Sequence, residues 1–153
     1  MITEENKNLL FKDLSGRLSY GVKVAYMTLS DDMPKVWDMI GLPAVGLVDI
    51  VVPGRYRFAA VPVEEIKPYL RPMDSMTEEE QREFGNLVGL WKNPGISRFV
   101  NRIPDLGEFG KTLITEIIIA RAIDWLNAHR FDYSGLIEKR LAIEAPEGMY
   151  KID

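Results

Sequence analysis

The stretch KTLITEIIIARAIDWLNAH, residues 111–129, has the strongest helical pattern in the chain. At about 100° per residue, its apolar side chains return on one face. That face holds Ile114, Ile118, Ala122, Trp125 and His129. Polar residues occupy the opposite face, flanked by Leu113 and Ile123. Because the apolar coverage is wide, we expect this helix to be central to the core.

Residues 21–62 have a different character. The runs at 21–26 and 45–52 are rich in β-forming residues, and Pro53-Gly54 predicts a turn before the next run. No helix-length segment separates these runs, which argues against an alternating βαβ domain. Four short strands with tight turns predict a small antiparallel sheet or an SH3-like barrel.

Helices are expected on both sides of this segment. Residues 3–15 have Thr3 as a possible N-cap. The run Thr77-Glu78-Glu79-Glu80 fits a capping box, with the hydroxyl and the last carboxylate three residues apart. The predicted class is α+β, with a β-rich N-terminal half and a helical C-terminal half. We expect two modules, 1–72 and 73–153, that share one core.

The net charge and the absence of cysteine argue against some classes of function. The 153 residues carry 19 basic and 23 acidic side chains, a net charge of −4. Nucleic-acid binders draw affinity from neutralising phosphates, so an acidic balance makes such partners unlikely without excluding them. The absence of cysteine removes disulfides, thiolate nucleophiles and sulfur-ligated zinc.

The same sequence carries no sign of export or membrane insertion. The N-terminal residues lack a basic stretch followed by an apolar one, which a secretion signal requires. No apolar stretch is long enough to span a membrane. The expected location is the cytoplasm, with no membrane partner.

Bound metals and cofactors are not expected. One histidine and no cysteine leave carboxylates as the main possible ligands. The acidic runs Asp31-Asp32 and Glu78-Glu79-Glu80 do not follow the spacing of a calcium loop. Neither a Walker A loop nor a Gly-x-Gly-x-x-Gly fingerprint occurs.

The single histidine, His129, is followed by Asp132 and Tyr133. A hydrolase would use His129 as a base oriented by Asp132. The favoured interpretation is structural, because a histidine at a helix C-terminus meets the negative end of the helix dipole. No Gly-x-Ser-x-Gly elbow accompanies it. The three residues are a candidate surface, and enzyme activity is not favoured.

Basic and aromatic residues alternate in Arg55-Tyr56-Arg57-Phe58. On a strand, Arg55 and Arg57 would face outward while Tyr56 and Phe58 pack inward. Such an outward face in a small barrel can bind single-stranded nucleic acid, which makes a nucleic-acid-binding accessory protein the first alternative function. The favoured interpretation is a solvated strand face, because the aromatic rings lie on the wrong side for stacking on bases.

Three blocks have a distinctive literal sequence: YGVKV at 20–24, IKPYLRPMDSMTEEE at 66–80, and FDYSGLIEK with LAIEAPEGMY at 131–139 and 141–150. They resemble an uncharacterised family of small gut-bacterial proteins associated with phages and prophages. The chain has Asp74, Ser134 and Arg140 where the family pattern has Ser, Arg and Gly. Because serine stands at position 134 where the family pattern has arginine, the positive charge beside Asp132 is missing. This chain therefore cannot form the Arg–Asp pair that the family pattern would allow there. The resemblance implies no activity, but it implies a mobile-element context rich in accessory and host-takeover proteins.

These observations favour a non-enzymatic protein-interaction module. Its partner would be another protein or a second copy of this chain. The segment 131–150 is expected to dock on the helix 111–129 near Trp125, because a helix as short as 135–142 needs packing to persist. The alternative is that its apolar side chains stay exposed as the partner site.

Overall fold

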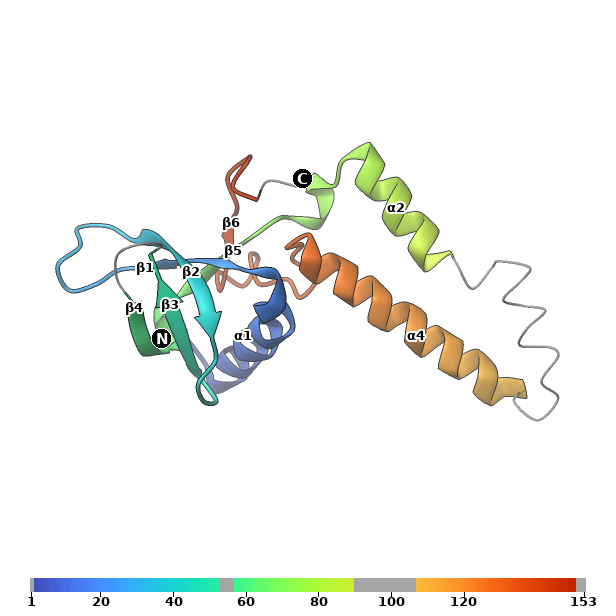
Figure 1. Cartoon of the computed structure of the whole chain (residues 1–153), viewed down its shortest axis with the longest axis horizontal. Helices are drawn as coiled ribbons and strands as arrows, with labels where there is room; N and C mark the ends of the chain where they lie inside the picture. The colour runs from blue at the N-terminus through green and yellow to red at the C-terminus, as the bar shows by residue number, and fades with distance from the viewer. Residues whose placement is uncertain (1, 53–56, 90–106, 151–153) are drawn as a thin grey trace. The chain divides into compact units, whose positions relative to one another are not determined.

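The structure is a computed structural model that describes residues 2–52, 57–89 and 107–150 (Figure 1). It confirms the α+β class. The helices are α1 (Glu4–Arg17), α2 (Glu78–Val88) and α4 (Gly107–Ala128). The strands are β1 (Lys23–Tyr26), β2 (Lys35–Gly41), β3 (Leu47–Val51), β4 (Arg57–Pro62), β5 (Lys67–Leu70) and β6 (Ile143–Glu144). Short 3-10 turns occupy Leu18–Tyr20, Val63–Glu65 and Met73–Ser75.

The strands form one open, mixed sheet in the order β4-β3-β2-β1-β5-β6. Neighbouring strands are antiparallel except β5 and β6, which are parallel. The barrel alternative is therefore wrong, and the antiparallel prediction holds for all strands but the last. The sheet does not need to close on itself, because Leu10 and Leu14 of α1 pack into the same buried cluster as Val24, Trp37 and Ile50.

Residues near its two ends explain where helix α1 starts and where the chain turns after it. The Thr3 hydroxyl accepts a hydrogen bond from the Asn6 backbone N–H at 3.2 Å, which caps the first turn. Leu10 and Leu14, one turn apart, are buried on one face. After the following 3-10 turn, Gly21 adopts φ +74° and leads into β1.

Contacts divide the chain into two compact units, residues 1–73 with 127–153 and residues 74–126. The predicted modules instead grouped 127–153 with the helices. The segment after α4 belongs with the sheet because β6 pairs with β5, and because Leu136, Leu141 and Ala142 join the core cluster there. The segment therefore packs on the sheet and α1. It also bonds the end of the predicted helix, through Tyr133 and Asn127, and the expected docking near Trp125 stays a prediction.

Further contacts anchor this segment in the first unit. The Tyr150 hydroxyl donates to the Tyr69 carbonyl oxygen at 2.7 Å and accepts from the Lys23 backbone N–H at 3.0 Å. Arg140 adopts φ +60°, a backbone conformation that favours glycine. Arg140 therefore carries its side chain on a strained backbone.

The second unit contains α2 and most of α4. The predicted capping box is confirmed: the Thr77 hydroxyl accepts from the Glu80 N–H at 3.1 Å, and a Glu80 carboxylate oxygen accepts from the Thr77 N–H at 3.0 Å. The rings of Phe84 and Trp125 lie 5.3 Å apart between centroids. This ring contact joins α2 to α4 within the unit.

The helix predicted at 111–129 is confirmed as α4, but its predicted place at the centre of the core is wrong for its described side chains. Ile118 and Ala122 are buried, whereas Ile117, Ile119 and Ile123 are exposed. Within the described part of the chain, no residue of α4 belongs to the main core cluster. Helical periodicity shows which side chains share a face, but not which face the rest of the chain covers.

Candidate functional site

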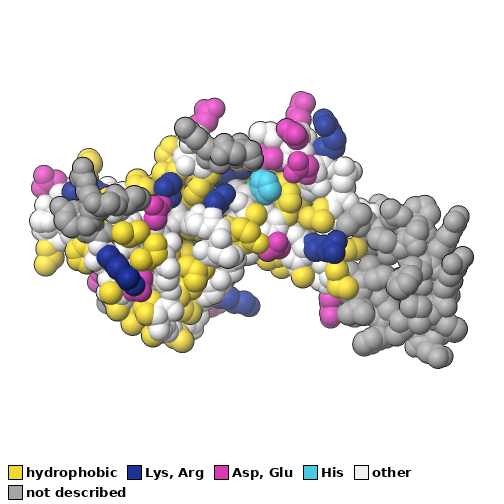
Figure 2. Space-filling model, viewed as in Figure 1, with side chains coloured by type: hydrophobic (Ala, Val, Ile, Leu, Met, Phe, Trp, Pro, Cys, Tyr) yellow, Lys and Arg dark blue, Asp and Glu magenta, His cyan; other side chains and the backbone are white. Residues whose placement is uncertain are grey.

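The predicted surface residues after α4 have local structural contacts. The His129 ring reaches the surface (cyan in Figure 2) and stacks on the Phe131 ring, with centroids 6.4 Å apart. The Asp132 carboxylate accepts hydrogen bonds from the N–H groups of Leu136 and Ile137, each at 2.9 Å. The Asp132 side chain therefore caps the following turns, and the hydrolase interpretation stays a prediction.

The other predicted surface residues bond within the first unit or lie outside the description. The Tyr133 hydroxyl donates to the Asn127 side-chain oxygen at 2.8 Å. Arg57 lies on β4, at the opposite edge of the sheet from β6, so it is not brought together with His129. Its guanidinium is 3.3 Å from the Asp49 carboxylate, which offsets part of its charge. Arg55 lies outside the described residues.

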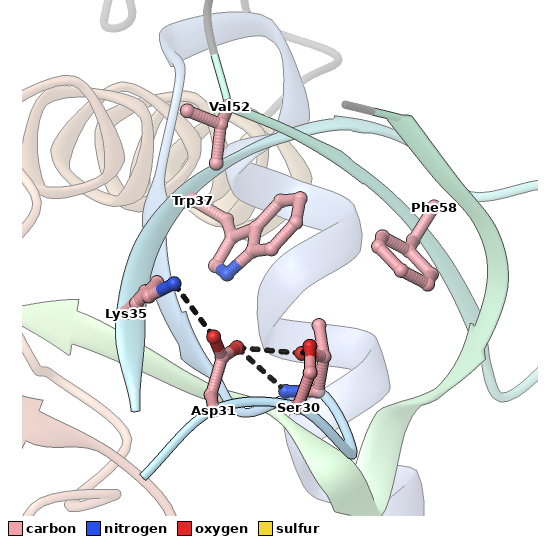
Figure 3. Close-up of a pocket in the computed structure, with 7 residues that line it drawn as sticks. Ser30, Asp31, Lys35, Trp37, Val52 and Phe58 are labelled. Atoms are coloured by element: carbon pink, nitrogen blue, oxygen red, sulfur yellow. Dashed lines mark hydrogen bonds and ion pairs between the residues drawn. The ribbon is translucent and has the colours of Figure 1, made fainter. Parts of the chain in front are cut away.

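A more organised site lies at one end of the sheet. A cavity of about 350 Å³ opens between the β1–β2 loop and strands β2, β3 and β4. Its lining residues are Thr28, Ser30, Asp31, Lys35, Trp37, Val52 and Phe58. Figure 3 shows the Trp37 and Phe58 rings projecting into it from the curved sheet, with the polar residues on the opposite side. We call this cavity the Trp37 pocket.

Three aromatic rings form the apolar wall behind the pocket. Trp37 and Phe58 meet almost perpendicularly, at 82° with centroids 5.4 Å apart. Tyr26 lies 5.9 Å from each of them. Edge-to-face contacts of this kind are favourable beyond simple burial, so they stabilise the arrangement of the three rings. Such walls suit a flat apolar group.

The opposite side of the pocket is an ordered turn around one carboxylate. Asp31 accepts hydrogen bonds from the N–H and the hydroxyl of Thr28 at 2.9 and 2.8 Å, and Lys35 Nζ lies 2.6 Å from its other oxygen. The Asp31 side chain is only 6% exposed, whereas that of Lys35 is 62% exposed. The donors from Lys35 and Thr28 lower the pKa of Asp31 from 3.8 to about 2.

This pKa gives a prediction for stability against pH. Because the folded pKa is depressed, the carboxylate stabilises the fold above pH 3.8 and loses that contribution as the pH falls towards 2. We expect Asp31→Asn to be less stable than the natural chain at neutral pH, with the gap closing between those two values. Urea unfolding across a pH series measures the gap. The control is Asp32→Asn, at an exposed neighbour. A gap that stayed constant down to the lowest pH would contradict the assignment.

One polar atom of the pocket stands out. The Trp37 side chain is almost fully buried, at 2% exposure. Among the described residues, its indole nitrogen Nε1 finds no hydrogen-bond partner. Figure 3 shows this nitrogen on the edge of the ring that faces Lys35 and Asp31. A buried donor without an acceptor is destabilising, by roughly 1–3 kcal/mol, and native proteins rarely retain one without a reason.

The loop that supplies the polar side of the pocket also carries solvent-exposed apolar side chains. The loop between β1 and β2 contributes Met27, Leu29 and Met33, all exposed, and Leu29 is fully so. Phe58 adds a partly exposed ring from β4. Single exposed apolar side chains are ordinary, but a group of them around a preformed cavity is typical of a binding surface.

Sequence reasoning found only part of this site. It placed Phe58 inward but did not single out Trp37. A signal was present in the sequence before β2, where Met27, Leu29 and Met33 lie among polar residues. Beside a strand that carries a large aromatic residue, Trp37, such a loop indicates an interaction surface.

The described residues show neither a cluster of metal ligands nor a membrane-spanning helix. They contain no group of three or more histidine, cysteine or acidic side chains placed to hold a metal ion. None of the described helices is long and apolar enough to cross a membrane. In comparisons with known proteins, no family model, curated protein or solved structure matches the chain.

Proposed function

We propose that this protein is a non-enzymatic interaction module that binds an apolar segment of another protein at the Trp37 pocket. The observation that carries the proposal is the solvent exposure of Met27, Leu29 and Met33 on the same loop whose polar residues line an aromatic cavity. Methionine side chains are flexible and polarisable, so they adapt to a partner surface. A mobile-element accessory role, suggested by the family resemblance, is consistent with such a module.

The pocket fits the size and chemistry of a partner side chain. Its volume of about 350 Å³ is at the lower end for ligand sites. It offers an apolar wall from Trp37 and Phe58 and one ion pair, between Asp31 and Lys35. None of these groups is an activated nucleophile or a paired acid and base, so binding is the activity that the geometry supports.

Binding by side-chain insertion is favoured over strand addition. An exposed edge strand can pair with a partner strand. Here β4 carries a bulge, where Ala60 adopts φ +55° and donates its N–H to the Asp49 carboxylate at 2.8 Å. This inward-facing carboxylate and the bulge disturb the edge. The edge of β5 is already paired with β6.

The nucleic-acid alternative has weaker support. Its two arginines are Arg57, which pairs with Asp49, and Arg55, outside the described residues. The Phe58 ring lines the Trp37 pocket with Trp37 as its neighbour, instead of lying flat on the outer face for base stacking.

The proposal is tested with a displayed library of random peptides. Selected peptides should carry apolar residues, and Leu29→Asp should weaken their binding at least about tenfold, because a charge at a contact centre must be desolvated. The matched control is Val45→Asp, at an apolar residue 85% exposed in the β2–β3 turn. Equal loss in both variants, or no selected peptide at all, would contradict the proposal.

A second measurement identifies the partner class. Sedimentation velocity of the natural chain should show a monomer at micromolar concentration, since the proposed partner is another protein. A dimer that Leu29→Asp dissociates and Val45→Asp does not would show that a second copy of this chain occupies the surface instead.

A further inference from the structure

We propose that the Trp37 pocket recognises a neutral amide, with the carbonyl oxygen of the partner accepting a hydrogen bond from the Trp37 indole N–H. This inference rests on the proposed function, and it specifies which group of the partner enters the pocket. An asparagine or glutamine side chain, or an exposed backbone amide, has the required chemistry: a flat group with an acceptor and no charge.

The need for an acceptor follows from the donors in the pocket. The indole Nε1 of Trp37 is buried and, in the described part of the chain, without a partner. Indole is a donor only, so an acceptor alone can satisfy it. The Lys35 ammonium is already engaged, because it lies 2.6 Å from an Asp31 carboxylate oxygen.

The carboxylate that lines the pocket is largely occupied. Asp31 already accepts from the Thr28 N–H, the Thr28 hydroxyl and Lys35, three of the roughly four hydrogen bonds that a carboxylate can accept. A ligand that brought only donors would leave the indole N–H unsatisfied. This argues against a cationic group as the preferred occupant.

Charge argues against an anion. The Asp31–Lys35 pair is neutral as a unit, and the next residue in the chain, Asp32, is an exposed acidic side chain. An incoming carboxylate would be repelled by Asp32 and would compete with Asp31 for Lys35. A neutral carbonyl avoids both costs and still satisfies the indole.

The ligand needs a small opening of the pocket. The indole nitrogen has almost no exposed area of its own. Lys35 lies two residues before Trp37 on β2, so the two side chains project on the same face. Because the Lys35 side chain is mostly exposed, it can move aside without disturbing buried packing. We therefore assign Lys35 as the group that covers the indole edge in the free protein.

The test uses three probes with one ring in common: benzamide, benzoate and benzylamine. Two-dimensional ¹⁵N–¹H spectra of the full chain report the indole N–H of each of its 3 tryptophans, and Trp37→Phe assigns the signal of Trp37. If that variant does not fold, Trp91→Phe and Trp125→Phe assign it by elimination. Benzamide should move the Trp37 signal downfield in a saturable way, in the millimolar range expected for so small a ligand. The Trp125 signal is the internal control.

Each outcome has a defined meaning. Benzoate or benzylamine should bind at least about tenfold more weakly than benzamide, which corresponds to about 1.4 kcal/mol. Lys35→Ala should bind benzamide more tightly than the natural chain, because the cover is removed. An unmoved Trp37 signal, or equal binding of all three probes, would overturn the inference.

The inference and the proposed function fail separately. If random peptides bind but benzamide leaves the Trp37 signal unchanged, the amide inference is wrong and the interaction module stands. If benzamide moves the signal but no peptide is selected, amide recognition is supported as a small-molecule property and the protein partner is wrong.

Discussion

A chain that lacks residues 131–153 is expected to be insoluble or unfolded. Phe131 and Leu136 have no exposed surface, and Leu136 packs in the same cluster as Leu10 and Leu14 of α1. The same segment supplies β6, the partner of β5. Its removal would expose a large part of the core, so the loss of stability should exceed the few kcal/mol by which a domain is stable. Circular dichroism melting and the soluble fraction measure it.

Single substitutions in this segment make the expectation quantitative. Leu136→Ala should destabilise the fold by about 2–5 kcal/mol, because it leaves a cavity in a packed core. Glu138→Ala, at an exposed position two residues on, is the control and should change stability by less than about 0.5 kcal/mol. A truncated chain that melts like the full one, but loses a partner, would instead mark residues 131–150 as the working surface.

The second large effect is expected at the buried ion pair between Asp13 and Arg17. The Arg17 guanidinium donates to both Asp13 oxygens, at 2.6 and 3.1 Å, and to the Phe131 carbonyl oxygen at 2.7 Å. The two side chains are 1% exposed or less. The pair therefore ties α1 to the segment that follows α4, across 114 residues of sequence.

Asp13→Ala should destabilise the protein by about 3–5 kcal/mol, because it leaves the Arg17 charge buried without its partner. It also removes the acceptor of the Ser134 hydroxyl, 3.0 Å from Asp13. Lys12→Ala is the matched control, on the exposed side of the same helix. The midpoints of urea unfolding compare the variants.

A double substitution separates the charge from the packing. Asp13→Leu with Arg17→Met should recover part of the stability, since apolar residues can replace a buried pair without the cost of desolvation. If Asp13→Ala lowers the urea midpoint no more than Lys12→Ala does, the pair does not stabilise the fold and this explanation is wrong.

Local sequence signals predicted most elements correctly. Thr3 caps α1, Thr77 and Glu80 form the capping box of α2, and the periodic pattern at 111–129 becomes α4. These signals depend on residues within one or two turns of one another. The same kind of reasoning could not predict β6, which has two residues and no strand pattern of its own.

The candidate site was harder to predict because its residues come together only in the sheet. Tyr26, Trp37 and Phe58 belong to three strands, and the ring of Phe58 reaches Trp37 across the intervening strand β3. Each residue alone is an ordinary inward-facing aromatic. The exposed loop residues Met27 and Leu29 could have been recognised, because a run of such side chains in a polar loop is unusual.

The sequence by itself determined the α+β class, the N-terminal caps of α1 and α2, and the exclusion of disulfides and thiolate chemistry. It did not determine the helix limits, and the short helix expected at 135–142 is a series of turns. These properties follow from residue type and short spacing, which hold wherever the segment is placed. Only the tertiary structure decided that the sheet stays open, that residues 131–150 dock on α1 and β5, and that Ile117, Ile119 and Ile123 of α4 are exposed. Several apolar faces of the chain could pack against one another. Which faces do so depends on long-range contacts such as that of Lys23 with Tyr150, 127 residues apart. Such contacts gain their free energy only when the whole unit has assembled.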